Sequence, residues 1–236
     1  MPIQKFKTFS PLFDKILGGG LPRSSVTLFE LSPATYGWHH ANSILFEGLR
    51  NGEFGVYITF DHSPELIRHT LDNFGLDVKG FENSHKFFII NGFRWGEKED
   101  KYFIRDPSNY AELVNVFSTI KENAGDDLTD RCRCVVDSTV SLFFGYGAAK
   151  MISFALLLRE VSMRTGTASI ILSPIGIGRR INDILGVNAD VIVEFKGFEE
   201  CEKLVNKLRL RKMSGQEPSA WTPFTLVGNK IVFKGE

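Results

Sequence analysis

The pattern of apolar and polar residues switches repeatedly between the periods of strands and of helices. Short apolar runs predict strands, and apolar residues three and four positions apart predict helices. The predicted strands are residues 26–31, 56–60, 86–91, 132–137, 167–172, 191–195, 204–212, 222–227 and 231–233. The predicted helices are residues 9–17, 41–49, 63–74, 108–124, 148–163 and 179–185. This order predicts an α/β fold with a mainly parallel central sheet, helices on both faces and a C-terminal antiparallel hairpin extension.

Length and charge narrow the class of protein. The chain has 236 residues, 43% of them hydrophobic, which suits one large domain spanning residues 1–236. Lys+Arg and Asp+Glu number 28 each, so no overall field draws the chain to nucleic acid or to an anionic membrane. The N-terminal segment lacks the apolar stretch of a signal peptide, and no apolar run is long enough to span a bilayer. We therefore expect a cytoplasmic protein whose partners are neither nucleic acids nor membranes.

The stretch from residue 25 to residue 50 has the layout of a phosphate-binding loop. An apolar, strand-like run is followed by a turn and then by a segment whose apolar residues have the spacing of a helix. A phosphate-binding loop in this context reads GxxxxGK[ST], in which bare glycines let N–H groups surround phosphates, the lysine reaches the terminal phosphates and the hydroxyl binds magnesium. The turn in this chain reads LSPATYGWHH. The layout is therefore present without the side chains that bind phosphate and metal.

The surroundings of this loop resemble a known family. The resemblance is to the N-terminal half of the KaiC-like branch of the RecA superfamily of P-loop ATPases, and it lies in the run FDKILGGGLPRSSVTLFELSPATYGWHHANSILFEGLRNGEFGVYITFDHSPELI. It extends over nearly the whole chain through LLLREVSMRTGTASIILSP, NADVIVEF and KLRLRKMSG. The resemblance implies a RecA-like three-layer fold and, in active relatives, hydrolysis of ATP with magnesium.

On this resemblance the loop is a degenerate Walker A motif. Leu31 and Tyr36 stand at the positions of loop glycines. Gly37 stands at the position of the motif's lysine, and Trp38 stands at the position of its magnesium-binding Ser or Thr. Moving the register by one residue puts Trp38 at the lysine, so neither register supplies one. The positions of the degenerate nucleotide site are Ala34, Thr35, Tyr36, Gly37, Trp38 and Asp137. We expect neither ATP nor magnesium to bind there.

Two further motifs of the active relatives are also altered. Asp61 and His62 stand where those relatives carry a glutamate pair that polarises the attacking water. Lys212 and Ser214 stand where they carry a Lys-x-Arg motif that reaches a neighbouring subunit. Asp137 keeps the place of the Walker B acid, although it can equally be a strand-end carboxylate bonded to loop N–H groups. Phosphoryl transfer relies on positioned cations and metal, so these departures predict an inactivated homologue.

We therefore predict a pseudo-ATPase that acts as a regulatory or protein-binding module, for example in signal transduction. The resemblance implies a homo-oligomer or a hetero-oligomer with active KaiC-like relatives. A second hypothesis is that the chain is an enzyme or a ligand-binding protein that uses a rebuilt pocket in place of the nucleotide site. A third hypothesis is that the chain retains weak ATP binding.

The hypothesis of a rebuilt pocket includes a candidate metal site. His39, Asp61 and His62 should lie near the carboxyl ends of adjacent strands, where open α/β sheets place their ligands. Two imidazoles and a carboxylate suit zinc or another divalent ion. However, His39 and His40 are adjacent at a helix start and diverge by about 100°. Histidines that fill or cap a vacated pocket are the alternative.

Basic residues alternate with leucines along the predicted strand at 204–212. Lys207, Arg209 and Arg211 share one face of that strand, and Lys212 follows them. In the family that the chain resembles, this strand leads into the nucleotide-facing tail, so these four residues form a candidate subunit interface. The alternative is an ordinary solvated basic face.

Overall fold

The computed structural model describes residues 4–76, 78–93, 100–125, 128–177, 179–200, 202–228 and 230–233. The strands are β1 (Lys5–Phe6), β2 (Leu21–Pro22), β3 (Ser25–Leu31), β4 (Phe54–Thr59), β5 (Phe87–Asn91), β6 (Cys132–Asp137), β7 (Ala168–Pro174), β8 (Val191–Glu200), β9 (Lys203–Met213), β10 (Thr222–Val227) and β11 (Lys230–Phe233). The helices are α1 (Pro11–Ile16), α2 (Gly37–Arg50), α3 (Pro64–Asn73), α4 (Val78–Asn83), α5 (Tyr110–Ala124), α6 (Thr139–Tyr146), α7 (Ala148–Thr165), α8 (Arg179–Asn188) and the short 3-10 helix η2 (Ile175–Ile177). None of the helices in these ranges is both long enough and apolar enough to cross a bilayer.

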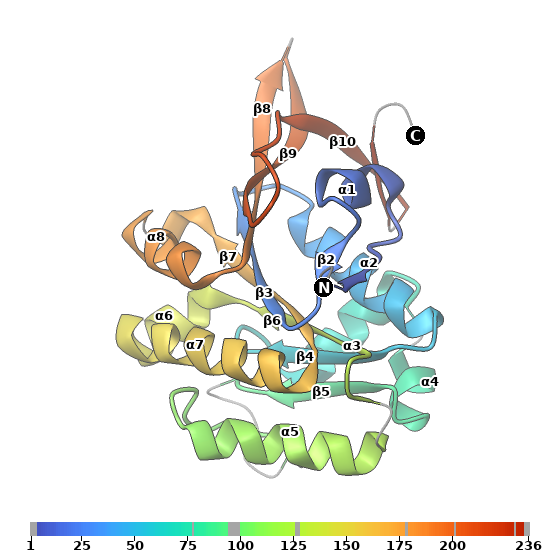
Figure 1. Ribbon diagram of the computed structural model, residues 1–236, viewed down its shortest axis with the longest axis vertical. Helices are drawn as coiled ribbons and strands as arrows, with labels where there is room; N and C mark the ends of the chain where they lie inside the picture. The colour runs from blue at the N-terminus through green and yellow to red at the C-terminus, as the bar shows by residue number, and fades with distance from the viewer. Residues whose placement is uncertain are drawn as a thin grey trace.

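Within the described ranges, nine strands form one sheet in the order β11-β10-β9-β8-β3-β7-β6-β4-β5. The strands from β8 to β5 in this order run parallel. β9, β10 and β11 add an antiparallel extension at one edge, and β9 and β10 lie in the upper part of Figure 1. β1 and β2 pair separately as a short antiparallel ribbon. The predicted fold class, a mainly parallel sheet with a C-terminal antiparallel extension, is confirmed.

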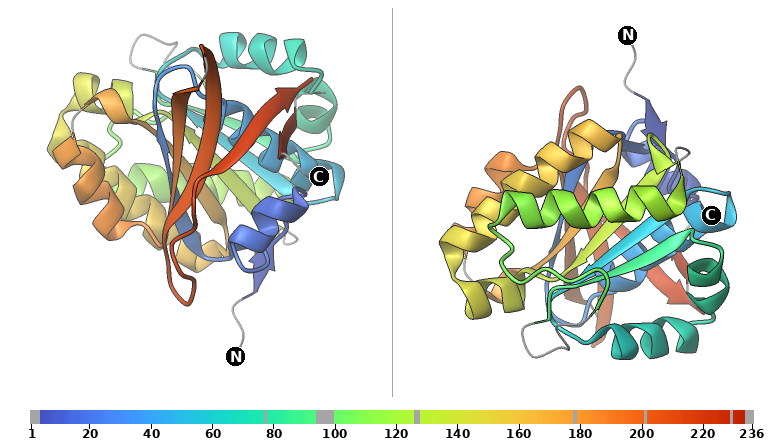
Figure 2. Two further views of the ribbon diagram at one scale, coloured as in Figure 1. Left: turned by 90° about the horizontal axis from the view of Figure 1, so that it is seen from above. Right: turned by 90° about the horizontal axis from the view of Figure 1, so that it is seen from below.

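Helices cover both faces of the parallel sheet, as Figure 2 shows from two sides. Successive strand residues point to opposite faces, so neighbours in one strand belong to different cores. Phe29 of β3 packs in the core that includes Leu45 of α2 and residues of α1 and α3. Leu28, one position earlier, packs in the second core with Leu158 of α7 and residues of α5 and α6. This two-sided burial explains why the strands read as continuous apolar runs.

α4 and α6 have no counterpart among the predicted helices. α6 begins after Ser138, whose Oγ accepts a hydrogen bond from the N–H of Val140 at 3.3 Å. Its sequence, TVSLFFGY, is apolar on most sides, although Phe144 is 74% exposed. Because no polar face sets a helical period, the pattern of apolar residues does not indicate where α6 begins.

α2 begins at Gly37, not at residue 41 as the apolar spacing predicts. Trp38, His39 and His40 therefore lie in its first turn. Tyr36 is the N-cap residue, and its side chain makes no capping hydrogen bond. The first turn is instead held by tertiary contacts of its aromatic side chains, which local periodicity does not register.

Candidate functional site

The loop between β3 and α2 is closed by its own hydrogen bonds. The hydroxyl of Thr35 donates to the carbonyl oxygen of Ser32 at 2.8 Å. Ala34 has a positive φ of 59°, the left-handed conformation that lets the chain turn between the strand and the helix. The N–H of His40 donates to the carbonyl oxygen of Tyr36 at 3.0 Å, as the first turn of α2 requires. The loop therefore keeps the strand-turn-helix layout expected from the sequence.

A side chain at Gly37 would collide with the end of the Leu31 side chain. A Cβ atom added to Gly37 would lie 2.1 Å from Cδ2 of Leu31 and 3.2 Å from Cγ of Phe195. Real Cβ atoms do not approach carbon atoms this closely, so Leu31 would have to move first. The side chain of Leu31 thus fills the space in which a lysine at position 37 would begin.

Trp38 reaches across the site to Asp137 at the end of β6. Its indole Nε1 donates to Oδ2 of Asp137 at 2.9 Å, and the hydroxyl of Tyr57 donates to the same oxygen at 2.6 Å. Asp137 is 7% exposed and Tyr57 is fully buried. Burial raises the pKa of Asp137, whereas the hydrogen bonds from Tyr57 and Trp38 act in the opposite direction. Burial and the neighbouring carboxyl group raise the pKa of Tyr57 well above its usual value.

Sequence reasoning missed the role of Tyr57. A buried tyrosine hydroxyl needs a partner, so its place in the apolar run FGVYIT was a signal that a polar group lies nearby. Nothing local indicated which group that is, because Asp137 lies 80 positions away. Of the two alternatives given for Asp137, the Walker B acid and a carboxylate bonded to loop N–H groups, neither specified these donors: at Oδ2 the donors are the side chains of Trp38 and Tyr57.

Asp61 holds the start of α6. Its Oδ2 accepts from the hydroxyl of Ser138 at 2.6 Å, and its Oδ1 accepts from the N–H of Ser141 at 3.0 Å. A carboxylate at a helix N-terminus is favourable because the first N–H groups of a helix lack partners within it. His62, the next residue, is exposed, and its carbonyl oxygen accepts from the hydroxyl of Thr59 at 2.8 Å.

The two histidines of α2 are aromatic packing groups. The ring of His39 meets Phe74 edge to face with 4.8 Å between ring centres, and burial lowers its pKa. His40 is 2% exposed, with its ring centre 4.6 Å from that of Phe13. Burial lowers the pKa of His40 to about 3, so its imidazole is neutral at physiological pH.

The predicted metal set is not assembled. Among the described residues, no group of three or more His, Cys, Asp or Glu side chains is placed to hold a metal ion. Asp61 is engaged with α6, His62 lies on the surface and His39 packs among aromatic rings. His40 likewise packs among aromatic rings.

The four basic residues of the candidate interface have partners within the chain. Arg209 pairs with Glu194 at 2.7 Å, Lys207 pairs with Glu200 at 2.5 Å, and Arg211 pairs with Glu30 of β3. The ammonium group of Lys212 donates to the carbonyl oxygens of Gly186, Val187 and Ala189 at the end of α8. Lys212 therefore caps a helix, which is a structural role that its position in the sequence did not indicate. The side chains of Arg209 and Arg211 stay 38% and 41% exposed.

Comparisons with known proteins agree on one family. A family model described as "ATPase: KaiC" matches residues 6–234. UPF0273 protein PH0284 of Pyrococcus horikoshii is 31% identical over 236 residues, which cover 97% of this chain and 93% of the relative. The UPF0273 protein of Aeropyrum pernix is 29% identical over 237 residues, which cover 98% of this chain and 93% of the relative.

A solved structure has the same fold. The KaiC-like protein PH0186 from the hyperthermophilic archaeon Pyrococcus horikoshii OT3 superposes with a TM-score of 0.79. The match covers 98% of this chain and 99% of the other, at 21% sequence identity. At that identity the comparison speaks for the fold alone.

Proposed function

The chain belongs to the KaiC family of ATPase domains, and from this premise we propose that it no longer hydrolyses ATP and acts as a regulatory, protein-binding member of that family. One observation carries the proposal. The indole N–H of Trp38 donates to the carboxylate of Asp137. A hydrogen bond within the protein therefore uses the carboxylate that would ligate a metal ion.

The geometry at Asp137 opposes magnesium. In the family pattern, Trp38 stands at the magnesium-binding hydroxyl and Asp137 stands at the Walker B acid. Magnesium takes oxygen ligands in an octahedral arrangement and keeps several of its waters. An indole supplies one N–H donor and no ligand atom. The indole and a hydrated magnesium ion therefore compete for the same carboxylate oxygen, and the indole is already tethered beside it.

The loop also offers no charge to a terminal phosphate. Leu31 covers Gly37, where active relatives carry the lysine. Phosphoryl transfer depends on cations that hold and neutralise the phosphate oxygens, so a loop without lysine or metal supplies little of the needed stabilisation.

The same substitutions suit a contact between proteins. Tyr36 and Trp38 are large, stiff side chains that each carry one polar atom, a combination enriched at protein interfaces. In the family that this chain resembles, nucleotide bridges neighbouring subunits, and here direct packing of these side chains replaces it. The chain assembles with itself or with active KaiC-like relatives through the surface around the loop. Arg209 and Arg211, still partly exposed, orient an acidic partner surface.

Calorimetric titration with millimolar ATP and magnesium tests the loss of nucleotide binding. We expect no measurable heat of binding, with a KaiC-like relative that retains the loop lysine as the positive control. Magnesium-dependent binding that Asp137→Asn abolishes would establish weak ATP binding in place of the proposed function. Binding that Asp137→Asn leaves unchanged would show that nucleotide enters without this carboxylate, and the proposal would be wrong.

A further inference from the structure

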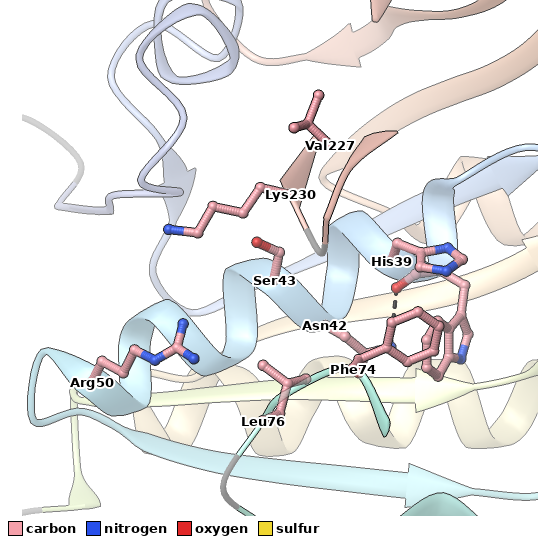
Figure 3. A pocket seen from close by; sticks show the side chains of 9 residues that line it. His39, Asn42, Ser43, Arg50, Phe74, Leu76, Val227 and Lys230 are labelled. Carbon is pink, nitrogen blue, oxygen red and sulfur yellow. Dashed lines mark hydrogen bonds between the residues drawn. The ribbon is translucent and has the colours of Figure 1, made fainter. Parts of the chain in front are cut away.

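A cavity of about 290 Å³ lies along the exposed flank of α2. Three segments far apart in the sequence enclose it, namely α2, the connection between α3 and α4, and the hairpin of β10 and β11. Its lining residues are Trp38, His39, Asn42, Ser43, Arg50, Phe74, Leu76, Val227 and Lys230. The two ends of this cavity differ in chemistry, as Figure 3 shows, with Arg50 and Lys230 toward one end and His39 and Phe74 toward the other.

One end of the cavity is aromatic. Phe74 lies with its ring centre 5.4 Å from that of Trp38 and 4.8 Å from that of His39. Leu76 and Val227 add aliphatic surface to the lining. Rings at these separations leave edges and faces that favour another flat ring. This end therefore suits an aromatic group.

The other end of the cavity is cationic. Arg50 and Lys230 both bind Oε1 of Glu47, at 2.9 Å and 2.7 Å. Two positive groups thus share one carboxylate oxygen, and the cluster of these three side chains keeps a charge of +1. An anionic group placed there gains a charge-assisted hydrogen bond.

The separation of the two ends sets the length of the ligand. His39 and Glu47 both belong to α2, and the rise of about 1.5 Å per residue puts them about 12 Å apart along the helix. We propose that this cavity binds a small arylalkanoate, an aromatic carboxylic acid. Its ring lies against Phe74, and its carboxylate lies between Arg50 and Lys230.

Calorimetric titration of the full chain with 3-(4-hydroxyphenyl)propanoate tests the proposal through two matched analogues. 3-(4-Hydroxyphenyl)propanamide lacks the charge and is expected to bind roughly tenfold more weakly. 3-Phenylpropanoate keeps both the aromatic ring and the carboxylate and is expected to bind with an affinity similar to that of the hydroxylated acid. Adenosine, which offers an aromatic ring and donors without a carboxylate, is expected to bind more weakly than the acid.

Three variants locate the binding. Ser43→Phe fills the cavity from a half-buried position and should abolish binding of the acid. The double change Arg50→Gln and Lys230→Gln should remove the preference for the acid over its amide. Lys150→Gln is the matched control, because Lys150 also pairs with a carboxylate, Asp106 at 2.7 Å, but lies outside the cavity lining.

Several outcomes would overturn the proposal. These are equal binding of the acid and its amide, tighter binding of adenosine, unchanged binding in Ser43→Phe, or no heat with millimolar acid. This titration uses no nucleotide phosphate or magnesium, so its failure would leave the proposed loss of ATP hydrolysis untouched.

Discussion

The indole of Trp38, in the first turn of α2, donates its N–H to the carboxylate of Asp137 at the end of β6. The bond joins the two positions to which the resemblance assigns the magnesium-binding hydroxyl and the Walker B acid. Under the proposed function, this hydrogen bond takes the place of a metal contact.

We predict that Trp38→Phe lowers the free energy of unfolding by about 2 kcal/mol. Phenylalanine keeps most of the packing but removes the N–H, so the buried carboxylate of Asp137 loses one of its donors. Urea unfolding of both proteins measures the difference. Trp221→Phe is the control, because the indole of Trp221 packs on Phe198 and Arg209 and should tolerate the change better. Equal effects of the two substitutions would contradict the prediction.

Gly37→Lys should destabilise the fold by about 1 to 3 kcal/mol, because the new side chain collides with Leu31. Leu31→Ala opens that space and should be less damaging in the Gly37→Lys protein than in the wild type. A double-mutant cycle from urea unfolding gives the coupling, which we expect to exceed about 0.5 kcal/mol in favour of the double variant. Strict additivity would mean that Leu31 does not exclude the lysine.

Acidification should destabilise the protein through His40. Its pKa is about 3 in the folded state, below the ordinary value of 6.5. The unfolded state therefore binds more protons between these values, and this contribution to stability, fully present above about pH 6.5, is lost as pH falls toward 3. For one such group, the slope of the unfolding free energy against pH approaches about 1.4 kcal/mol per pH unit.

His40→Phe should flatten this slope, since phenylalanine keeps an aromatic ring beside Phe13 and Phe195 and does not titrate. Unfolding free energies measured between pH 4 and pH 7 provide the comparison. His69→Gln, at an exposed position of α3, should leave the slope as it is in the wild type. A wild-type slope retained in His40→Phe would show that other groups cause the acid sensitivity.

Association should be independent of nucleotide and should depend on Trp38. We expect the mass in solution to exceed that of a monomer both with and without ATP, and Trp38→Ala to shift it toward the monomer. Tyr110→Ala is the control, because Tyr110 is a partly exposed aromatic residue on α5, in the opposite helical layer. A monomer under all conditions, or assembly only with ATP, would contradict the proposed interface.

The basic strand can be tested in the same measurement. Reversing the charges of Lys207, Arg209 and Arg211 should weaken association, but it also breaks their internal ion pairs. Exchanging Arg209 and Glu194 keeps their pair within the chain while altering the outward charge. If only the triple reversal changes the mass, the effect comes from lost internal pairing and not from the interface.

Much of the architecture could be read directly from the sequence. β6 and β10 have the predicted bounds, and the other predicted strands and helices are present with shifted ends. This is because the periods of strands and helices are local properties of the chain. The motifs also identified the family correctly, and the loop composition alone showed that position 37 carries no lysine.

Only the tertiary structure decided what the substituted residues do. Trp38 and Asp137 are 99 positions apart, and Arg211 and Glu30 are 181 positions apart. Their meeting depends on the order of strands in the sheet and on the start of α2 at Gly37, which side chains distant in sequence stabilise. The periodicity of a segment specifies which of its faces is buried, but not which residue of another segment it will meet, because that choice is made when the whole core packs.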